Sequence, residues 1–143
     1  MGKKRIIEKE EGAAGDGAKT GPIRGAKRRV SHGVLHVQAT YNNTLLSLSD
    51  AEGNVLGQAS SGSLGFKGAK KGTPFAAAKV GELLGDKAIE IGMRDVDVVV
   101  RGVGSGRESS IRAFSGKGLA ITGIKDATPV PHNGPRPKKA RRV

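Results

Sequence analysis

Two glycine-rich loops contain the residues of this chain whose types and spacing could do chemistry. Residues 57–72 hold five glycines together with Lys67, Lys70 and Lys71, and residues 102–106 alternate glycine with other residues before Arg107. Each loop precedes a predicted helix, and the first N–H groups of a helix lack partners within it and favour an anion. Glycine lets the backbone approach a ligand closely. We therefore expect phosphate to be the ligand of these loops.

The glycine spacing does not fit the motifs that bind mononucleotides. G-x-G-x-x-G fails because position 107 is Arg, and G-x-x-x-x-G-K-[ST] occurs nowhere in the chain. A flexible connector is the ordinary alternative for such loops. The cations in and beside them favour contacts with the phosphates of a nucleic-acid backbone instead.

The side chains that could support catalysis are scattered along the chain. His32, His36 and His132 are too dispersed to predict a metal site. A two-metal nuclease could be imagined from four carboxylates, but each of them lies at or near a strand end beside a turn, where Asp commonly caps or faces solvent. These four are Asp50, Asp95, Asp97 and Asp126. We expect no enzymatic activity, no catalytic residue, no metal and no cofactor.

The positive charge of the chain is concentrated in two tails. The 143 residues carry 25 Lys+Arg and 13 Asp+Glu, a net charge of +12, of which residues 1–31 and 127–143 contribute +5 each and residues 32–126 only +2. We therefore expect a disordered basic extension over 1–31, a folded core over 32–126 and an extended basic tail over 127–143, whose prolines favour an outward course. Such tails need a polyanion as partner.

Nucleic acid suits these tails better than a membrane does. Neither tail offers the apolar face that a helix buries in a membrane surface, and no run approaches the roughly 18 apolar residues that span a bilayer. The chain has no Cys, which suits a reducing compartment such as the cytoplasm. We expect a nucleic-acid partner and no membrane.

Hydrophobic periodicity predicts three strands, followed by helices that alternate with strands. Apolar and polar residues alternate over 34–40, 44–49 and 55–60, with turns between. Thr73-Pro74 is typical of a helix start, apolar residues then recur at helical spacing up to Ile91, and Gly92 suits a helix end. A strand over 96–100, a helix over 107–115 and a strand over 119–125 follow. This order implies a mixed sheet with helices packed against it.

Several blocks of the sequence closely resemble the family of small-subunit ribosomal protein eleven (S11). They are Tyr41-Asn42-Asn43-Thr44, Gly65-Phe66-Lys67-Gly68 with residues 70–77, Gly104-Ser105-Gly106-Arg107-Glu108, and Ile111-Arg112. Residues 126–134, with Arg136-Pro137, resemble the bacterial branch, and the resemblance covers about residues 30–143. Val103, Ala69 and Pro135 depart from the residues usual in bacterial relatives, and residues 1–22 have no counterpart.

The resemblance implies a non-catalytic cytoplasmic protein of the small-subunit platform near the mRNA exit path. It implies a three-layer α/β/α core with a mixed five-stranded sheet, similar to the ribonuclease H fold. The implied partners are small-subunit rRNA, small-subunit ribosomal proteins seven, eighteen and twenty-one, and mRNA near the exit path. The expected RNA contacts are Asn42, Asn43, Lys67, Gly68, Lys70, Lys71, Gly104, Gly106, Arg107, Arg112, Lys117, His132, Asn133, Arg136, Lys138, Lys139, Arg141 and Arg142.

The composition indicates how RNA would be recognised. One Tyr, three Phe and no Trp provide few platforms on which bases can stack. We therefore expect recognition of phosphates and shape to outweigh recognition of bases. The main alternative function is a free nucleic-acid-binding protein that acts as a chaperone or an architectural factor.

Overall fold

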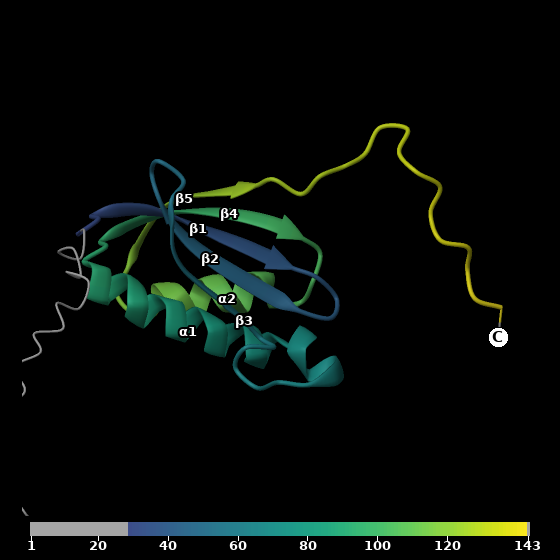
Figure 1. The fold of residues 1–143 in the computed structure, drawn as a ribbon, viewed down its shortest axis with the longest axis horizontal. Helices are drawn as coiled ribbons and strands as arrows, with labels where there is room; N and C mark the ends of the chain where they lie inside the picture. Colours follow the sequence, from purple (N-terminus) through teal and green to yellow (C-terminus); the bar gives the residue numbers. More distant parts are fainter. Residues whose placement is uncertain (1–28, 143) are drawn as a thin grey trace, which may run out of the picture.

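A mixed five-stranded sheet forms the centre of the protein. The computed structural model describes residues 29–142, so most of the predicted N-terminal extension lies outside the described residues. The strands are β1 (His32–Ala39), β2 (Thr44–Asp50), β3 (Val55–Ser60), β4 (Asp95–Gly102) and β5 (Ala120–Asp126), in the spatial order β3-β2-β1-β4-β5 (Figure 1). β2 runs antiparallel to both of its neighbours, while β4 runs parallel to β1 and β5 parallel to β4. The α/β fold with a mixed sheet is confirmed.

The long helix begins and ends at the residues that the sequence predicts. In α1 (Pro74–Ile91), the Thr73 hydroxyl caps the first turn by accepting a hydrogen bond from the N–H of Ala76 at 3.4 Å, and Pro74 occupies the first helical position. Gly92 ends the helix in the left-handed conformation, with φ of 92°. The second helix, α2 (Gly106–Ser115), is also near its predicted bounds. A short 3₁₀ helix, η1 (Gly68–Gly72), was not predicted within the first loop.

The core lies between the sheet and the two helices. One face of β1 and β4 presents alternate residues that are fully or almost fully buried, such as Leu35, Val37 and Val98. α1 covers them with Val80 and Leu84, and α2 adds Phe114, which is completely buried. Along β1, alternating burial thus matches the alternating hydrophobicity of the sequence.

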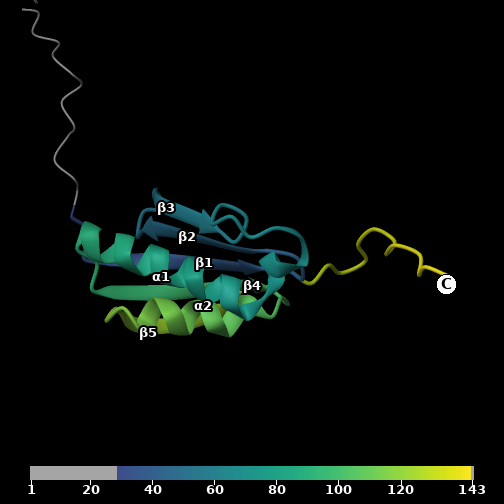
Figure 2. The ribbon, with the colours of Figure 1, turned by 90° about the horizontal axis from the view of Figure 1, so that it is seen from below.

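Both helices lie on the same face of the sheet and pack against each other (Figures 1 and 2). The expected third layer is therefore wrong for residues 29–142, which form two layers. The reason is topological. β3, β4 and β5 run in the same direction, and the connections β3-α1-β4 and β4-α2-β5 both move the chain the same way across the sheet. Right-handed crossovers then place both helices on one face.

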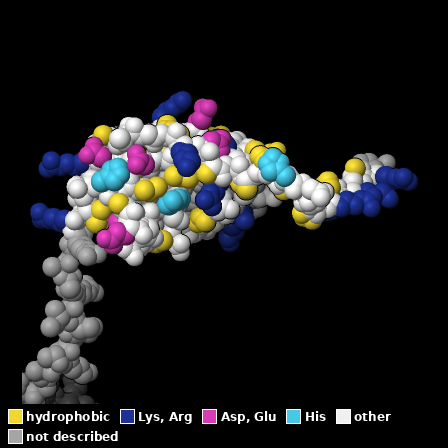
Figure 3. All heavy atoms as spheres, turned by 90° about the horizontal axis from the view of Figure 1, so that it is seen from above, with side chains coloured by type: hydrophobic (Ala, Val, Ile, Leu, Met, Phe, Trp, Pro, Cys, Tyr) yellow, Lys and Arg dark blue, Asp and Glu magenta, His cyan; other side chains and the backbone are white. Residues whose placement is uncertain are grey.

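The other face of the sheet has no covering helix within the described residues. His36, Gln38 and Arg101 are exposed there, beside the half-buried Val34 and Val99. Figure 3 looks onto this face and shows hydrophobic side chains among histidines and charged residues. Neither described α-helix is both long and apolar enough to cross a membrane.

Candidate nucleic-acid interface

Most of the predicted RNA-binding segments meet at one end of the sheet, which we call the carboxyl end. β1, β3, β4 and β5 all end there because they run in the same direction. The β1–β2 turn, the loop that contains η1, the starts of both helices and the first residues of the C-terminal tail are at this end (Figures 1 and 2). The parallel strands thus bring together segments that are far apart in the sequence.

Close backbone packing joins three of these segments. The Ser105 hydroxyl donates a hydrogen bond to the carbonyl of Gly72 at 2.7 Å, which ties the β4–α2 loop to η1. A Cβ atom at Gly72 would lie 2.1 Å from the Tyr41 carbonyl oxygen, and one at Gly104 would lie 2.2 Å from the Thr40 carbonyl oxygen. Both positions require glycine because the β1–β2 turn occupies the space of a side chain.

Gly106 packs against other segments of the protein and does not face solvent. An added Cβ atom would lie 2.4 Å from Thr44 Oγ1 and 2.7 Å from the Cβ of Ala77 on α1. Gly104 and Gly106 are both buried. The close approach that these glycines allow is therefore to neighbouring protein segments, and it sets the position of α2 against α1 and β2.

The three lysines of the first loop remain available to a ligand. Lys67 and Lys70 are exposed and Lys71 is half-buried. Within residues 29–142, none of the three is within 4.0 Å of a carboxylate oxygen. Asn42, in the adjacent turn, is also exposed. These side chains present positive charge and hydrogen-bond donors, which phosphate oxygens accept.

Arg107 has partners within the protein. One of its guanidinium nitrogens donates to the carbonyl of Gly102, and the other pairs with a carboxylate oxygen of Asp126 at 2.8 Å. This arrangement ties the start of α2 to the end of β5. Arg107 therefore already has a carboxylate partner within the protein, and its contact with RNA stays a prediction.

Asp126 and Thr128 fasten the start of the C-terminal tail. The backbone N–H and the hydroxyl of Thr128 both donate to Asp126 Oδ1, at 2.9 and 2.6 Å. Together with Arg107, these donors hold the pKa of Asp126 well below its usual range. The Thr128 hydroxyl also accepts from the N–H of Gly102 at 3.2 Å. The tail therefore starts from a fixed point at the carboxyl end.

Beyond this point the tail runs outward from the body of the protein (Figure 1). Residues 129–142 are exposed and form no helix or strand. Asn133 has a positive φ of 58°, which turns the chain before the basic residues. The predicted RNA contacts of the tail are His132, Asn133, Arg136, Lys138, Lys139, Arg141 and Arg142, all of them exposed.

Comparison with known proteins identifies the family. A model of the family described as ribosomal protein S11 matches residues 33–142. The chain is 57% identical over 125 residues to the small ribosomal subunit protein uS11 of Synechococcus sp., covering 87% of this chain and 95% of the relative. It is 56% identical over 120 residues to the protein of the same name from Acaryochloris marina, covering 84% and 92%.

The chain belongs to the ribosomal protein S11 family. The matched residues contain every helix and nearly every strand residue, together with the tail up to Arg142. The resemblance to the bacterial branch of the family is confirmed. Individual RNA contacts stay predictions.

Two predicted contacts of this S11 family member lie away from the carboxyl end. Lys117 follows the other end of α2 and pairs with Asp86 at 2.8 Å, a contact that raises the pKa of the lysine. Arg112 is exposed on α2, beside an apolar groove formed with Ile111, Ile121 and Ile124. The structure does not bring these two cations together with the loop lysines.

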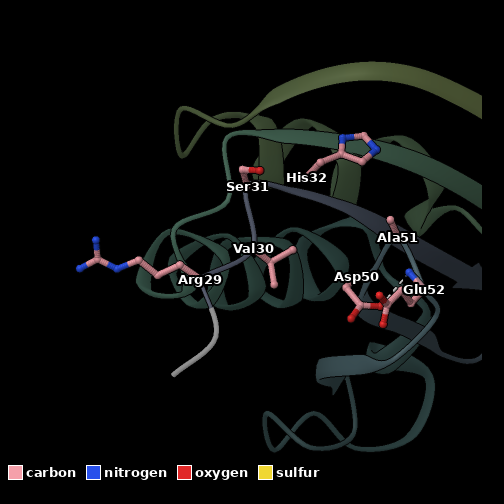
Figure 4. Close-up of a pocket in the computed structure, with 7 residues that line it drawn as sticks. All are labelled: Arg29, Val30, Ser31, His32, Asp50, Ala51 and Glu52. Carbon is pink, nitrogen blue, oxygen red and sulfur yellow. Dashed lines mark hydrogen bonds between the residues drawn. The ribbon is translucent and has the colours of Figure 1, made fainter. Parts of the chain in front are cut away.

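A hollow at the opposite end of the sheet carries charges of both signs. It is lined by residues 29–32 and 50–52, so that the carboxylates of Asp50 and Glu52 share it with Arg29 (Figure 4). The side chain and backbone of Asn54 and the N–H of Glu52 donate to Asp50, and these hydrogen bonds lower its pKa. Asp50 thus closes its own turn. Among the described residues, no three His, Asp or Glu side chains gather where they could hold a metal ion.

Three contributors to this end of the protein were missed from the sequence. Ser105 and Thr128 position the loop and the tail, and Phe75 is exposed in the first turn of α1, directly after the loop that contains the lysines. The Asp126-Ala127-Thr128 triplet after a strand is a recognisable signal, because an Asp side chain often accepts from the backbone two residues on. Ser105 gives no comparable signal, since its acceptor is 33 residues away.

Proposed function

We propose that this protein is a structural constituent of the small ribosomal subunit that binds rRNA with the carboxyl end of its sheet. The observation that carries the proposal is the gathering at that end of an exposed asparagine, the start of the basic tail and lysines that pair with no carboxylate of residues 29–142. Family membership supplies the class of RNA, since the relatives are named small ribosomal subunit proteins. The proposal assigns no catalytic role.

The distribution of carboxylates favours the carboxyl end over the opposite one. Asp50, Glu52, Asp95 and Asp97 lie at or near the opposite end, where β1 and β4 begin and β2 ends. At the carboxyl end, the carboxylate of Asp126 is already neutralised by Arg107, which leaves Glu108 in the first turn of α2 as the exposed carboxylate there among the described residues. A phosphate therefore meets less repulsion beside the loop lysines.

The loop and the tail would have different roles in binding. Lys67, Lys70 and Lys71 sit on a loop fixed by Ser105 and Gly72, so they would hold the body of the protein in one orientation on RNA. The tail offers five further cations between positions 136 and 142. Its sixteen residues from 127 to 142 could span at most about 55 Å when fully extended, enough to enter the space between RNA helices.

The location that we propose within the subunit follows from the S11 resemblance. It is the platform near the mRNA exit path, with small-subunit proteins seven, eighteen and twenty-one as neighbours and mRNA within reach of the tail. The uncovered face of the sheet and the groove beside α2 leave surface for such neighbours. The geometry of residues 29–142 supports binding by phosphate contacts, whereas these neighbours rest on family resemblance alone.

Co-sedimentation with small subunits through a high-salt wash tests the proposal against a free chaperone. An integral component should stay with the subunit, because it is held by buried contacts as well as by charge. A loosely bound cationic protein is stripped, since salt screens exposed charge. Complete loss of the protein from washed subunits would contradict the proposal.

A further inference from the structure

Three of the four aromatic residues of this protein lie at or close to the carboxyl end of the sheet. Phe114 is fully buried in the core. Tyr41 is in the β1–β2 turn, Phe66 precedes η1, and Phe75 is in the first turn of α1. Tyr41 is 78% exposed and Phe75 is 65% exposed. A chain with few aromatic residues thus places two of them on the surface where the lysines are.

Phe75 is held in place without being covered. Its ring meets the ring of Phe66 in a T-shaped arrangement, with centroids 6.1 Å apart and planes at 83°. The ammonium group of Lys79, which is also 2.9 Å from a carboxylate oxygen of Glu82, lies 5.8 Å from the Phe75 centroid. An edge-on neighbour and one cation orient the ring and leave most of its surface to solvent.

The surroundings of Phe75 resemble a site that binds RNA. Lys67, Lys70 and Lys71 belong to the loop between Phe66 and Phe75, and none of them is paired with a carboxylate within residues 29–142. Side chains that bind single-stranded nucleic acid combine cations for the backbone with an aromatic ring on which a base stacks. An apolar protein partner would gain nothing from three adjacent unpaired cations.

We propose that Phe75 is a stacking platform for one unpaired base of rRNA, oriented by Phe66 and flanked by the loop lysines on the neighbouring phosphates. This site rests on the proposed function and adds recognition of a base to it. It requires a base that is splayed out of any helix, since a paired base does not offer its face.

The ordinary alternative is that the Phe66–Phe75 pair only anchors the loop to α1. The two readings differ in what each ring contributes. If the pair is an anchor, Phe66→Leu and Phe75→Leu should weaken RNA binding equally, because each removes one side of the same contact. If Phe75 stacks on a base, Phe75→Leu should be much the more damaging.

The absence of tryptophan from the sequence allows a direct spectroscopic test. Phe75→Trp places a single tryptophan at the site, and Ile89→Trp places one at a half-exposed position of the same helix, about 21 Å further along at 1.5 Å per residue. Each full-length variant is titrated with a transcript of bacterial small-subunit rRNA. Stacking should strongly quench the tryptophan fluorescence of the Phe75→Trp variant, while that of the Ile89→Trp control changes little. Unchanged fluorescence of a Phe75→Trp protein that binds the transcript would overturn the proposal.

Affinity measurements separate this proposal from the proposed function. Stacking on one base corresponds to a factor of roughly 5 to 150 in affinity, so Phe75→Leu should raise the Kd by at least fivefold without changing its salt dependence. Phe75→Tyr should keep the wild-type Kd, and Lys70→Ala should instead reduce the salt slope by about one. Thermal unfolding of each variant shows that it is folded. Equal Kd values for wild type, Phe66→Leu and Phe75→Leu would refute the stacking proposal and leave the proposed function intact. A wild-type protein that does not bind the transcript would refute the proposed function.

Discussion

Substitution of Gly106 by alanine should destabilise the fold through contacts within the protein. The new methyl group would lie 2.4 Å from Thr44 Oγ1 and 2.7 Å from the Cβ of Ala77, whereas ordinary contacts of a Cβ atom begin at 3.4 Å. α2 must therefore move away from α1 and β2 by most of an ångström. Overpacking of this kind costs about 1–3 kcal/mol of the free energy of unfolding.

The expected cost corresponds to a measurable change in melting temperature. For a domain of this size, 1 kcal/mol shifts Tm by about 4 °C, so Gly106→Ala should lower Tm by about 4–12 °C in a thermal unfolding experiment followed by circular dichroism. Gly62→Ala is the matched control, because the nearest atom to its added Cβ lies at 3.7 Å. The control should melt close to the wild type.

A second substitution shows whether the proposed clash is the cause. Thr44 Oγ1 is buried and has no hydrogen-bond partner among the described residues, so Thr44→Ala removes the closest obstacle and sacrifices no hydrogen bond. The double variant should recover part of the Tm lost by Gly106→Ala. A Gly106→Ala protein with wild-type Tm, or a double variant with no recovery, would refute this account of the glycine.

The C-terminal tail and Asp126, the last residue of β5, are open to further tests. Deleting residues 135–143 should reduce the slope of log K against log[salt] for RNA by about four to five, since each phosphate contact contributes about 0.9 on duplex; an unchanged slope in a filter-binding series would show that the tail points away from RNA. The pKa of Asp126 lies below its ordinary value of 3.8 in the folded protein, so the carboxylate stabilises the fold above that pH and progressively less below it. Asp126→Asn should therefore lower Tm at pH 6, and the difference from wild type should narrow towards pH 2; a constant difference would contradict this. Finally, residues 131–142 should give narrow, poorly dispersed amide signals by NMR in the free protein and change on RNA binding, because their polar composition does not offset the entropy of ordering; dispersed signals without RNA would argue against it.

The elements could be predicted from the sequence because their signals are local. Thr73, Pro74 and Gly92 mark the ends of α1, and each acts within one helical turn of its own position. Most strands follow from alternation of apolar and polar residues, and β4 follows from the short apolar run over 96–100. Such signals depend on neighbours in the chain, so no knowledge of the tertiary fold is needed.

The arrangement of the helices could not be predicted from these signals. Whether α1 and α2 share a face depends on the order of the strands in the sheet, and hydrophobic alternation contains no information on that order. Once the order β3-β2-β1-β4-β5 is known, right-handed crossovers give the answer. The resemblance to the S11 family suggested three layers, and the described residues have two.

The roles of individual site residues depended on contacts across the chain. Arg107 and Gly106 have the residue types of a phosphate-binding loop, yet one is paired with Asp126, 19 residues away, and the other packs against Ala77. A glycine looks the same in sequence whether it approaches a ligand or a helix. The accessibility of the loop lysines is a more local property, because residues 57–75 contain no acidic neighbour for them to pair with. Their contact with RNA stays a prediction.

A matched exchange of charge can show whether rRNA binds at the carboxyl end of the sheet. One variant replaces Lys67 and Lys70 by alanine, and the control replaces two exposed cations near the opposite end, Lys87 and Arg94. Both variants lose two positive charges, and the Kd for a small-subunit rRNA transcript is measured across a salt series. The loop variant should lose about two units of salt slope and more than tenfold in affinity, while the control stays near wild type. Equal losses, or a larger loss in the control, would contradict the claim.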